Sequence, residues 1–278
     1  LAPFNETDLC STEGLCLQSA ASRAGLLAKI VTRMNAFPDL ASIKLIAAES
    51  SGPGSDSRAE ILANATVAPR VAAIAYHQYS ASSTQDAYNT ASPPQFLTEF
   101  NGFSNPFCGT PTWAGGGKSH ADLLLNGLLA GNSAALVWDD VDAWHVHQNN
   151  FQTFGLFFTG FAGASPPVAD SARCAMAFPT PTQLDGATYA PRSQYFVTKH
   201  FSKFVAPGAR RVAVSLTGNG AAVGFLNPDS SIVIAGRNKS TTAGESIHLS
   251  ISGGTSTNLA SARLYYSNAT SNFVQDGA

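Results

Sequence analysis

The sequence predicts an α/β domain built on a parallel sheet, followed by an all-β domain. In the first two-thirds of the 278 residues, short apolar runs alternate with segments whose apolar residues recur at helical spacing. This order is typical of βα units. Beyond about residue 206, short β-branched runs separated by Gly, Asn and Asp turns predict an antiparallel β-sandwich. We therefore expect one domain over 1–206 and a side domain over 207–278.

Each element of the first domain is expected from its own pattern. The expected strands are 2–5, 41–50, 70–80, 93–102 and 133–144. The expected helices are 17–35, 120–131 and 193–205. The strands are nearly continuous in apolar character, as in strands buried on both faces. The last helix is stopped by Pro207-Gly208, where the side domain begins.

The side domain is expected to consist of short strands. Its candidate strands lie at 211–217, 221–238, 246–253 and 262–268. Asn227-Pro228-Asp229 has the composition of a hairpin turn within the second of these runs. The pattern therefore favours antiparallel pairing in this part of the chain.

The composition is that of a secreted protein. Hydrophobic residues make up 44% of the chain and charged residues 12%, against roughly 25% charged in ordinary soluble domains. A net charge of −2 gives no electrostatic reason to expect nucleic acid or an anionic membrane. No apolar run approaches the roughly 20 residues that span a bilayer. We expect an extracellular monomer with no nucleic-acid or membrane partner.

The cysteines and sequons agree with secretion. Four cysteines form an even set: Cys10, Cys16, Cys108 and Cys174. Disulfides are the expected state, with the pairing open and buried free thiols as the alternative. No C-x-x-C spacing supports a zinc site. Candidate glycan acceptors in N-x-S/T sequons are Asn64, Asn238 and Asn268, and Asn5 matches the same pattern.

Polar or aromatic residues stand at the end of every expected strand. These strand ends are Asn5-Glu6, Glu49, His77 to Tyr79, Glu99, and Trp138-Asp139. In barrel and open α/β enzymes, ligands bind at the carboxyl ends of parallel strands. We therefore expect these side chains to share one functional edge.

Two acids at this edge, Glu6 and Glu99, fit glycoside cleavage. That reaction needs one carboxyl group to protonate the leaving oxygen and another to attack or stabilise the oxocarbenium-like centre. Burial and mutual repulsion can separate the pKa values of two such groups. A glutamate at a strand end is otherwise more often a capping or salt-bridging residue, and the residue types alone leave that alternative open.

Ordered motifs resemble clan A glycoside hydrolases, and family 30 within that clan. "PFNE", "AYHQY", "FLTEFNG" and "ALVWDDVDAWHVHQ" resemble strands 4, 6, 7 and 8 of the (β/α)8 TIM barrel. "QYFVTKHFSKFVAPGARRVAVS" is similar to the segment that joins the last barrel helix to a side β-sandwich. The resemblance implies the C-terminal part of such a barrel, strands 4–8, followed by the sandwich.

The resemblance implies a retaining mechanism. It makes Glu6 the general acid/base and Glu99 the nucleophile. Asn5 matches the residue that hydrogen-bonds the sugar 2-hydroxyl, so a glycan there would block the pocket. His77 and Tyr79 match the strand-6 position near the nucleophile, where a phenol can favour the charged carboxylate.

Further substrate contacts are expected around this pair. The resemblance places Trp138 as a platform beneath the sugar, since aromatic rings suit the apolar face of a pyranose. We expect Glu49 at the rim or in contact with substrate, and Asp139 in the strand-8 cleft, with Asp140, Asp142 and His145 as further candidates there. His145 and His147 share a strand face, but no third ligand is apparent, so neither a metal nor another cofactor is expected.

The chain departs from the family pattern in two ways. Thr7 follows Glu6 where family members commonly have proline. Counterparts of barrel strands 1–3 and of an N-terminal sandwich strand are missing, and five strands do not close an eight-stranded barrel. We expect this sequence to be a fragment of a longer enzyme.

The expected activity is hydrolysis of a β-linked polysaccharide. "CSTEGLC" and "WDDVDAWHVH" resemble fungal endo-β-1,6-galactanases, so that activity is favoured. The alternatives are a β-1,6-glucanase or xylanase of the same family, or a non-catalytic carbohydrate-binding relative. A β-sandwich interaction protein with an appended half-barrel would leave the polar strand ends unexplained.

Overall fold

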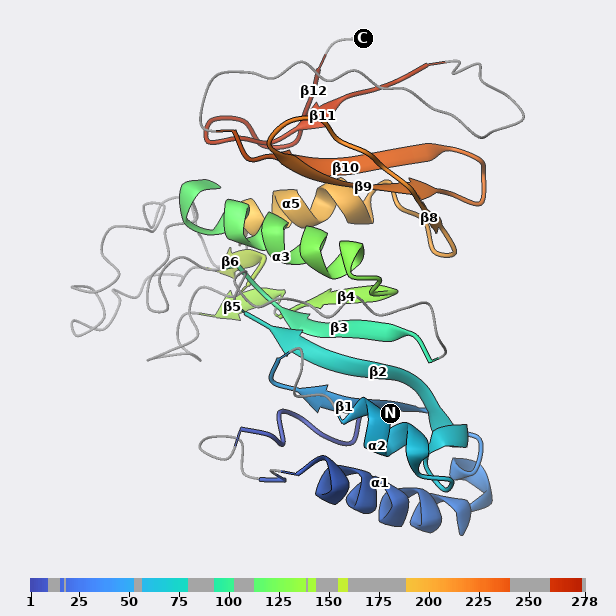
Figure 1. Ribbon diagram of the computed structural model, residues 1–278. Helices are drawn as coiled ribbons and strands as arrows, with labels where there is room; N and C mark the ends of the chain where they lie inside the picture. Colours follow the sequence, from blue (N-terminus) through green and yellow to red (C-terminus); the bar gives the residue numbers. More distant parts are fainter. Residues whose placement is uncertain are drawn as a thin grey trace, which may run out of the picture. The chain divides into compact units, whose positions relative to one another are not determined.

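The chain folds into two compact units. A computed structural model describes residues 1–9, 16–17, 19–52, 57–79, 93–102, 113–138, 140–143, 155–159, 189–240 and 261–276. The first unit comprises Leu1–Phe103 and Asp122–Val141, and the second comprises Ser104–Ala121 and Asp142–Ala278 (Figure 1). The division into domains at residue 206 stays a prediction.

A parallel sheet forms the centre of the first unit. Its strands, in spatial order, are β1 (Leu45–Ser50), β2 (Val71–Gln78), β3 (Gln95–Phe100) and β4 (Ala134–Val137). All three neighbouring pairs are parallel, which confirms the βα pattern of the sequence. Successive residues from Ala73 to Gln78 are buried, as expected for a strand covered on both faces.

Helices connect these strands. In the first half of the chain they are α1 (Ala20–Asn35), η1 (Pro38–Leu40), α2 (Arg58–Ala63) and η2 (Ala68–Arg70). The π-helical turn η3 (Trp113–Gly117) leads into α3 (Lys118–Leu129). Ser19 is the N-cap of α1, and its hydroxyl accepts a hydrogen bond from the Ser22 amide at 3.1 Å. The sequence did not predict α2, a helix of six residues.

The core of the first unit lies between α1 and the first strands. Leu27 and Val31, on one stripe of α1, are fully buried and belong to the same hydrophobic cluster as Leu45 and Ile74. This is the amphipathic face that the helical spacing predicts. It fixes β1 and β2, whose carboxyl ends carry the polar residues described below.

Two of the predicted strands require correction. Residues 2–5 form no regular strand, although this segment borders β1 through hydrogen bonds between Leu1 and Ile46 (2.9 Å) and between Glu6 and Glu49 (2.9 Å). Pro3 has no amide hydrogen, so a continuous ladder cannot form there. The predicted strand 133–144 divides into β4 and β5 (Val141–Ala143), which belong to different sheets.

The second unit contains separate small sheets. β5 lies in a three-stranded sheet with β6 (Phe157–Thr159) and β7 (Tyr189–Pro191), followed by α5 (Ser193–Ser202). A second sheet has the order β10-β9-β8, and β11 pairs with β12. The bounds of these strands are β8 Arg210–Val212, β9 Gly220–Leu226, β10 Ile232–Asn238, β11 Tyr265–Tyr266 and β12 Val274–Gln275.

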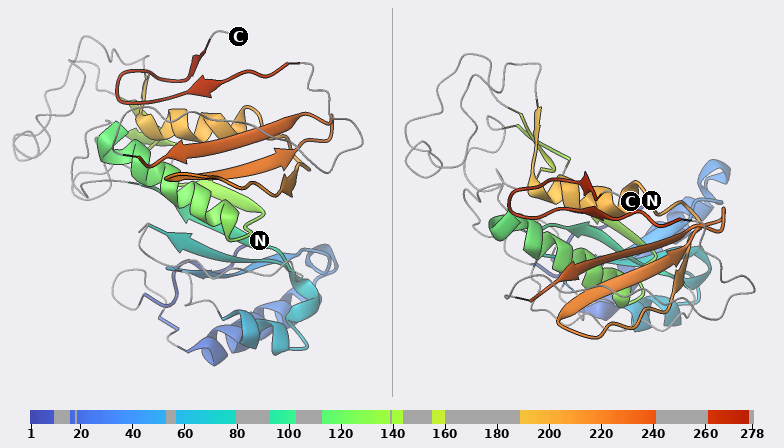
Figure 2. Two further views of the ribbon diagram at one scale, coloured as in Figure 1. Left: turned by 45° about the horizontal axis from the view of Figure 1, so that its top comes forward. Right: turned by 90° about the horizontal axis from the view of Figure 1, so that it is seen from above.

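Antiparallel pairing in the C-terminal part is confirmed. β9 and β10 form a hairpin, seen from two further directions in Figure 2. Its turn is the predicted Asn227-Pro228-Asp229, closed by a hydrogen bond from the Asn227 amide to the Ser231 carbonyl at 2.9 Å. The predicted strand 246–253 lies outside the described residues.

The structure also bears on the predicted disulfides and on the prediction that no segment spans a membrane. Cys16 takes part in a disulfide, while the other three cysteines lie outside the described residues, so the pairing stays a prediction. Within the described part of the chain, none of the helices combines the length and the hydropathy needed to cross a bilayer.

The core position of Leu27 gives a first testable prediction. Leu27→Ala should lower the free energy of unfolding by about 3 kcal/mol, because it removes a fully buried side chain and leaves a cavity. Urea denaturation measures this. Lys29→Ala, at an exposed position of the same helix, is the matched control and should change stability by less than about 0.5 kcal/mol. Equal effects of the two substitutions would contradict the packing described for α1.

Candidate active site

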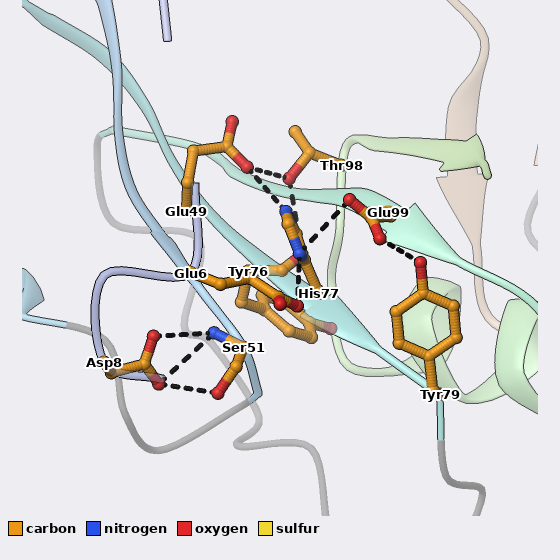
Figure 3. A network of polar contacts seen from close by, with 9 residues as sticks. All are labelled: Glu6, Asp8, Glu49, Ser51, Tyr76, His77, Tyr79, Thr98 and Glu99. Carbon is orange, nitrogen blue, oxygen red and sulfur yellow. Dashed lines mark hydrogen bonds and ion pairs between the residues drawn. The ribbon is translucent and has the colours of Figure 1, made fainter. Parts of the chain in front are cut away.

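Three acids and one histidine meet at the carboxyl end of the parallel sheet. Glu6 comes from the N-terminal segment, Glu49 from β1, His77 from β2 and Glu99 from β3 (Figure 3). All four belong to the first unit. Polar residues that end adjacent parallel strands therefore share one edge, as the sequence predicts.

The imidazole of His77 is the centre of this group. Its Nδ1 atom lies 2.8 Å from Glu6 Oε1 and 3.3 Å from Glu99 Oε2. Its Nε2 atom lies 3.0 Å from Glu49 Oε2. The ring is 2% exposed, so water contributes little to its hydrogen bonding. One imidazole thus contacts all three carboxyl groups.

Irregularities in the strands on both sides of β2 bring these groups together. Ala48 and Ser50 of β1 pair with consecutive residues of β2, so Glu49 is an extra residue, a β-bulge. On the other side, Leu97 and Glu99 of β3 pair with Tyr76 and His77, so Thr98 is the extra residue. A bulge changes the face toward which the following side chains point. The second bulge therefore places Glu99 opposite His77.

The two bulged residues are hydrogen-bonded to each other. The Thr98 hydroxyl donates to Glu49 Oε2 at 2.6 Å, alongside the bond from His77 to the same oxygen (Figure 3). The Glu6 amide donates to the Glu49 carbonyl at 2.9 Å. Glu49 is therefore held through both its side chain and its backbone.

The backbone of this edge is strained. Glu6, Ala48 and Glu49 have φ values of 44°, 77° and 50°, in the left-handed region that non-glycine residues rarely occupy. Each such residue costs roughly 1–2 kcal/mol. Strain of this kind persists where surrounding contacts over-determine the conformation, and it gathers at functional sites.

Glu99 has a second partner in Tyr79. The Tyr79 hydroxyl donates a hydrogen bond to Glu99 Oε1. Burial raises the pKa of Glu99, while the bond from Tyr79 and the charge of His77 act in the opposite direction. The rings of Tyr79 and Trp138 also meet in a T-shaped arrangement, with ring centroids 6.4 Å apart and planes at 88°. Tyr79 therefore links Trp138 to the carboxyl group.

The protonation of His77 follows from its neighbours. Burial alone would lower its pKa, but hydrogen bonds with Glu49 and Glu6, together with the charges of Glu99 and Glu6, raise the pKa to about 9. The imidazolium form is therefore favoured at neutral pH, where it can stabilise neighbouring carboxylates.

The same residues have the spacing of a metal-binding group. Glu6, His77 and Glu99 each place one possible ligand atom within 4.8 Å of the others. Both nitrogen atoms of His77 already face carboxylate oxygens, which an imidazolium satisfies as a double donor. We therefore interpret the group as a hydrogen-bonded acid–imidazole cluster.

Apart from Glu49, most of the predicted site residues fall into three groups. Glu6, His77, Tyr79, Glu99 and Trp138 lie in one connected set of contacts. Asn5 is exposed, and a contact of this residue with substrate stays a prediction. Asp139, His145 and His147 lie outside the described residues, as does the side chain of Asp142.

The structure gives Glu49 a different environment from the predicted rim. It is 5% exposed and faces His77, which favours a role toward the histidine over contact with substrate.

Sequence reasoning missed two polar residues close to these acids in the chain. Thr98 bonds Glu49, and Asp8 accepts hydrogen bonds from the Ser51 amide at 3.0 Å and hydroxyl at 2.7 Å. Thr98 directly precedes Glu99 and Asp8 follows Glu6 by two residues, and this proximity in the chain was the available signal.

Comparison with known proteins supports the fold. No family model matches the chain, and no curated protein matches it. The glycoside hydrolase family 30 subfamily 8 xylanase Xyn30A from Clostridium acetobutylicum is 18% identical over 87% of this chain and 51% of its own, with a TM-score of 0.55. A family 30 endoxylanase from Clostridium papyrosolvens C71 is 16% identical over 86% and 50%, with a TM-score of 0.55.

The chain spans about half the length of these two structures. At this identity the likeness concerns the fold alone. It agrees with a parallel sheet from part of a barrel together with antiparallel sheets of a side domain. The resemblance to family 30 is thereby confirmed at the level of fold.

The charge on His77 predicts how stability depends on pH. The pKa of His77 is about 9 in the folded state, above the ordinary 6.5, so protonation of this ring stabilises the fold. The stabilisation is fully present below about pH 6.5 and is lost as the pH rises through about 9. Wild type should therefore exceed His77→Gln in unfolding free energy by an amount that shrinks by up to about 3 kcal/mol between these pH values. Urea denaturation at several pH values measures the gap. A gap independent of pH would contradict the assigned charge.

Proposed function

We propose that this chain carries the catalytic acids of a secreted retaining glycoside hydrolase that cleaves β-linked polysaccharide. The observation that carries the proposal is the convergence of Glu6 and Glu99 on His77 Nδ1, with one oxygen of each carboxyl within 4.8 Å of the other. Retaining glycosidases hold their carboxyl groups about 5–5.5 Å apart, whereas inverting enzymes need about 6.5–9.5 Å. The spacing therefore favours double displacement.

The first chemical step uses both acids. Glu99 attacks the anomeric carbon as a carboxylate, the bond to the leaving oxygen breaks, and Glu6 gives its proton to that oxygen. In the second step Glu6, now a carboxylate, takes a proton from water. The water oxygen attacks the same carbon and releases Glu99. Neither step of the proposed reaction requires a cofactor.

The neighbours of Glu99 fit the nucleophile role. Tyr79 donates a hydrogen bond to one of its oxygens and the charge of His77 lies beside the other, and both oppose the effect of burial on the carboxylate. Trp138 packs against Tyr79 in a T-shaped arrangement at the same strand ends, and we propose that a sugar ring stacks on it.

The preferred substrate in this proposal is β-1,6-galactan, cleaved internally. It rests on the resemblance of the segments "CSTEGLC" and "WDDVDAWHVH", most of which lie outside the described residues. Xylan is the second candidate, because the two similar structures are a xylanase and an endoxylanase. Product analysis of the full chain on β-1,6-galactan, β-1,6-glucan and xylan decides among them.

Glycosylation forms part of the proposal. In each of the three candidate sequons, the asparagine Oδ1 accepts the backbone amide two residues later, from Thr66, Ser240 and Thr270 respectively. Asn64, Asn238 and Asn268 are therefore in local turns, and all are at least partly exposed. Turns of this kind suit surface acceptor sites for N-linked glycans.

Replacing the nucleophile gives the sharpest test. Glu99→Ala should lower hydrolysis by at least about a thousandfold, because no carboxylate remains to form the glycosyl-enzyme. Azide should restore turnover by occupying the vacated space, and it should form a glycosyl azide of inverted configuration. Glu60→Ala, an exposed glutamate of α2, is the control. Activity near wild type in Glu99→Ala would exclude this residue as nucleophile.

Removing the phenol should change the pH dependence. Without the Tyr79 donor, which lowers the Glu99 pKa, the carboxyl should ionise at higher pH. We expect Tyr79→Phe to move the acidic limb of the kcat/KM profile to higher pH. Tyr266→Phe, at an exposed position of β11, provides the control. An unchanged acidic limb would show that the phenol does not set the ionisation of Glu99.

A further inference from the structure

Glu49 is a buried acid that the proposed chemistry does not use. It is 5% exposed, and it directs Oε2 at His77 Nε2 (3.0 Å) and at the Thr98 hydroxyl (2.6 Å). Burying a carboxylate is costly unless it is paired and hydrogen-bonded. The pairing here is with the one residue that also contacts both proposed catalytic acids.

The backbone is deformed at Glu49. The residue is the bulge of β1, and it and Ala48 have φ values of 50° and 77°. A regular strand would avoid this cost but would place the side chain differently. The Glu6 amide holds the strained carbonyl of Glu49 at 2.9 Å. The deformation therefore fixes the acid/base and the buried acid in one geometry.

The donors and acceptors around His77 give Glu49 a chemical effect. A neutral imidazole has one N–H donor and one acceptor nitrogen, whereas an ionised carboxylate only accepts. Both nitrogen atoms of His77 face carboxyl oxygens. With Glu49 ionised at Nε2, that nitrogen must donate, and Nδ1 can donate as well only if the ring is an imidazolium.

We infer that Glu49 is a positioning residue for the proposed reaction, on which this inference rests. Its carboxylate keeps His77 doubly protonated, so that Nδ1–H can donate to Glu6 and the imidazolium charge can stabilise Glu99. Oxygens of these two acids lie 2.8 Å and 3.3 Å from Nδ1, the first in a hydrogen bond and the second in an ion pair. As Glu99 loses its charge by forming the ester and Glu6 gains one by losing its proton, the imidazolium stays beside the acid that carries the charge.

The groups that face His77 agree with this assignment. They are Glu6 from the N-terminal segment, Glu49 from β1 and Glu99 from β3, with Tyr79 beyond Glu99. Burial lowers the pKa of His77, and the hydrogen bond with Glu49 is the largest influence that raises it. Of the three acids, Glu49 alone takes no part in either chemical step.

Histidine titration tests the inference without substrate. In the full chain labelled with 15N-histidine, the nitrogen shifts of His77 should report an imidazolium that titrates near pH 9. Glu49→Gln keeps the shape but removes the charge, and it should weaken proton binding by His77 at least about tenfold. Thr98→Val keeps the carboxylate but removes one bond that orients it, so it should give a smaller shift in the same direction. Glu60→Gln should leave the titration unchanged.

The kcat/KM profile supplies the second readout. Glu49→Gln should lose activity above about pH 8 while keeping activity within about threefold of wild type at about pH 5.5, where His77 is protonated in both proteins. An equal loss at every pH, or an unchanged His77 titration in folded Glu49→Gln and Thr98→Val, would overturn the inference. An inactive wild type whose His77 titrates as expected would instead refute the proposed function.

Discussion

The site depends on one imidazole that has two N–H donors and three carboxyl neighbours. His77 is almost fully buried, so its hydrogen bonds with Glu6 and Glu49 and its ion pair with Glu99 replace the water that these groups would otherwise bind. Carboxylates this close repel one another, and a shared cation offsets the repulsion. A protonated His77 therefore favours the close approach of the proposed acid and nucleophile.

Two bulges in the parallel sheet bring carboxyl groups to His77. β2 presents His77, and bulges in the two adjoining strands, at Glu49 and at Thr98, bring carboxyl groups to both of its nitrogen atoms. The packing of α1 on β1 and β2 in one hydrophobic cluster stabilises these strands. Burial in the core thus offsets strain at the carboxyl edge, a division of roles common in functional sites.

The sequence predicted which residues lie at the carboxyl edge of the sheet more accurately than how their side chains are oriented there. Apolar runs ending in Glu99 and His77 correctly placed these residues at neighbouring strand ends, since that inference needs only strand order. The orientation of Glu49 was not predicted. Side chains alternate between the two faces of a regular strand, but a bulge, which depends on contacts distant in sequence, shifts this alternation. The apolar character of 133–144 likewise concealed the break between β4 and β5.

Hydrolysis by double displacement requires Glu6 and Glu99 to act from opposite sides of one glycosidic bond, with no water between Glu99 and the anomeric carbon in the first step. The configuration of the first product tests this most directly. Proton NMR during the first minutes of hydrolysis of a β-linked glycan should show the β-anomer accumulating first and equilibrating later. Initial appearance of the α-anomer would contradict the account, because inversion requires carboxyl groups about 6.5–9.5 Å apart with a water between them.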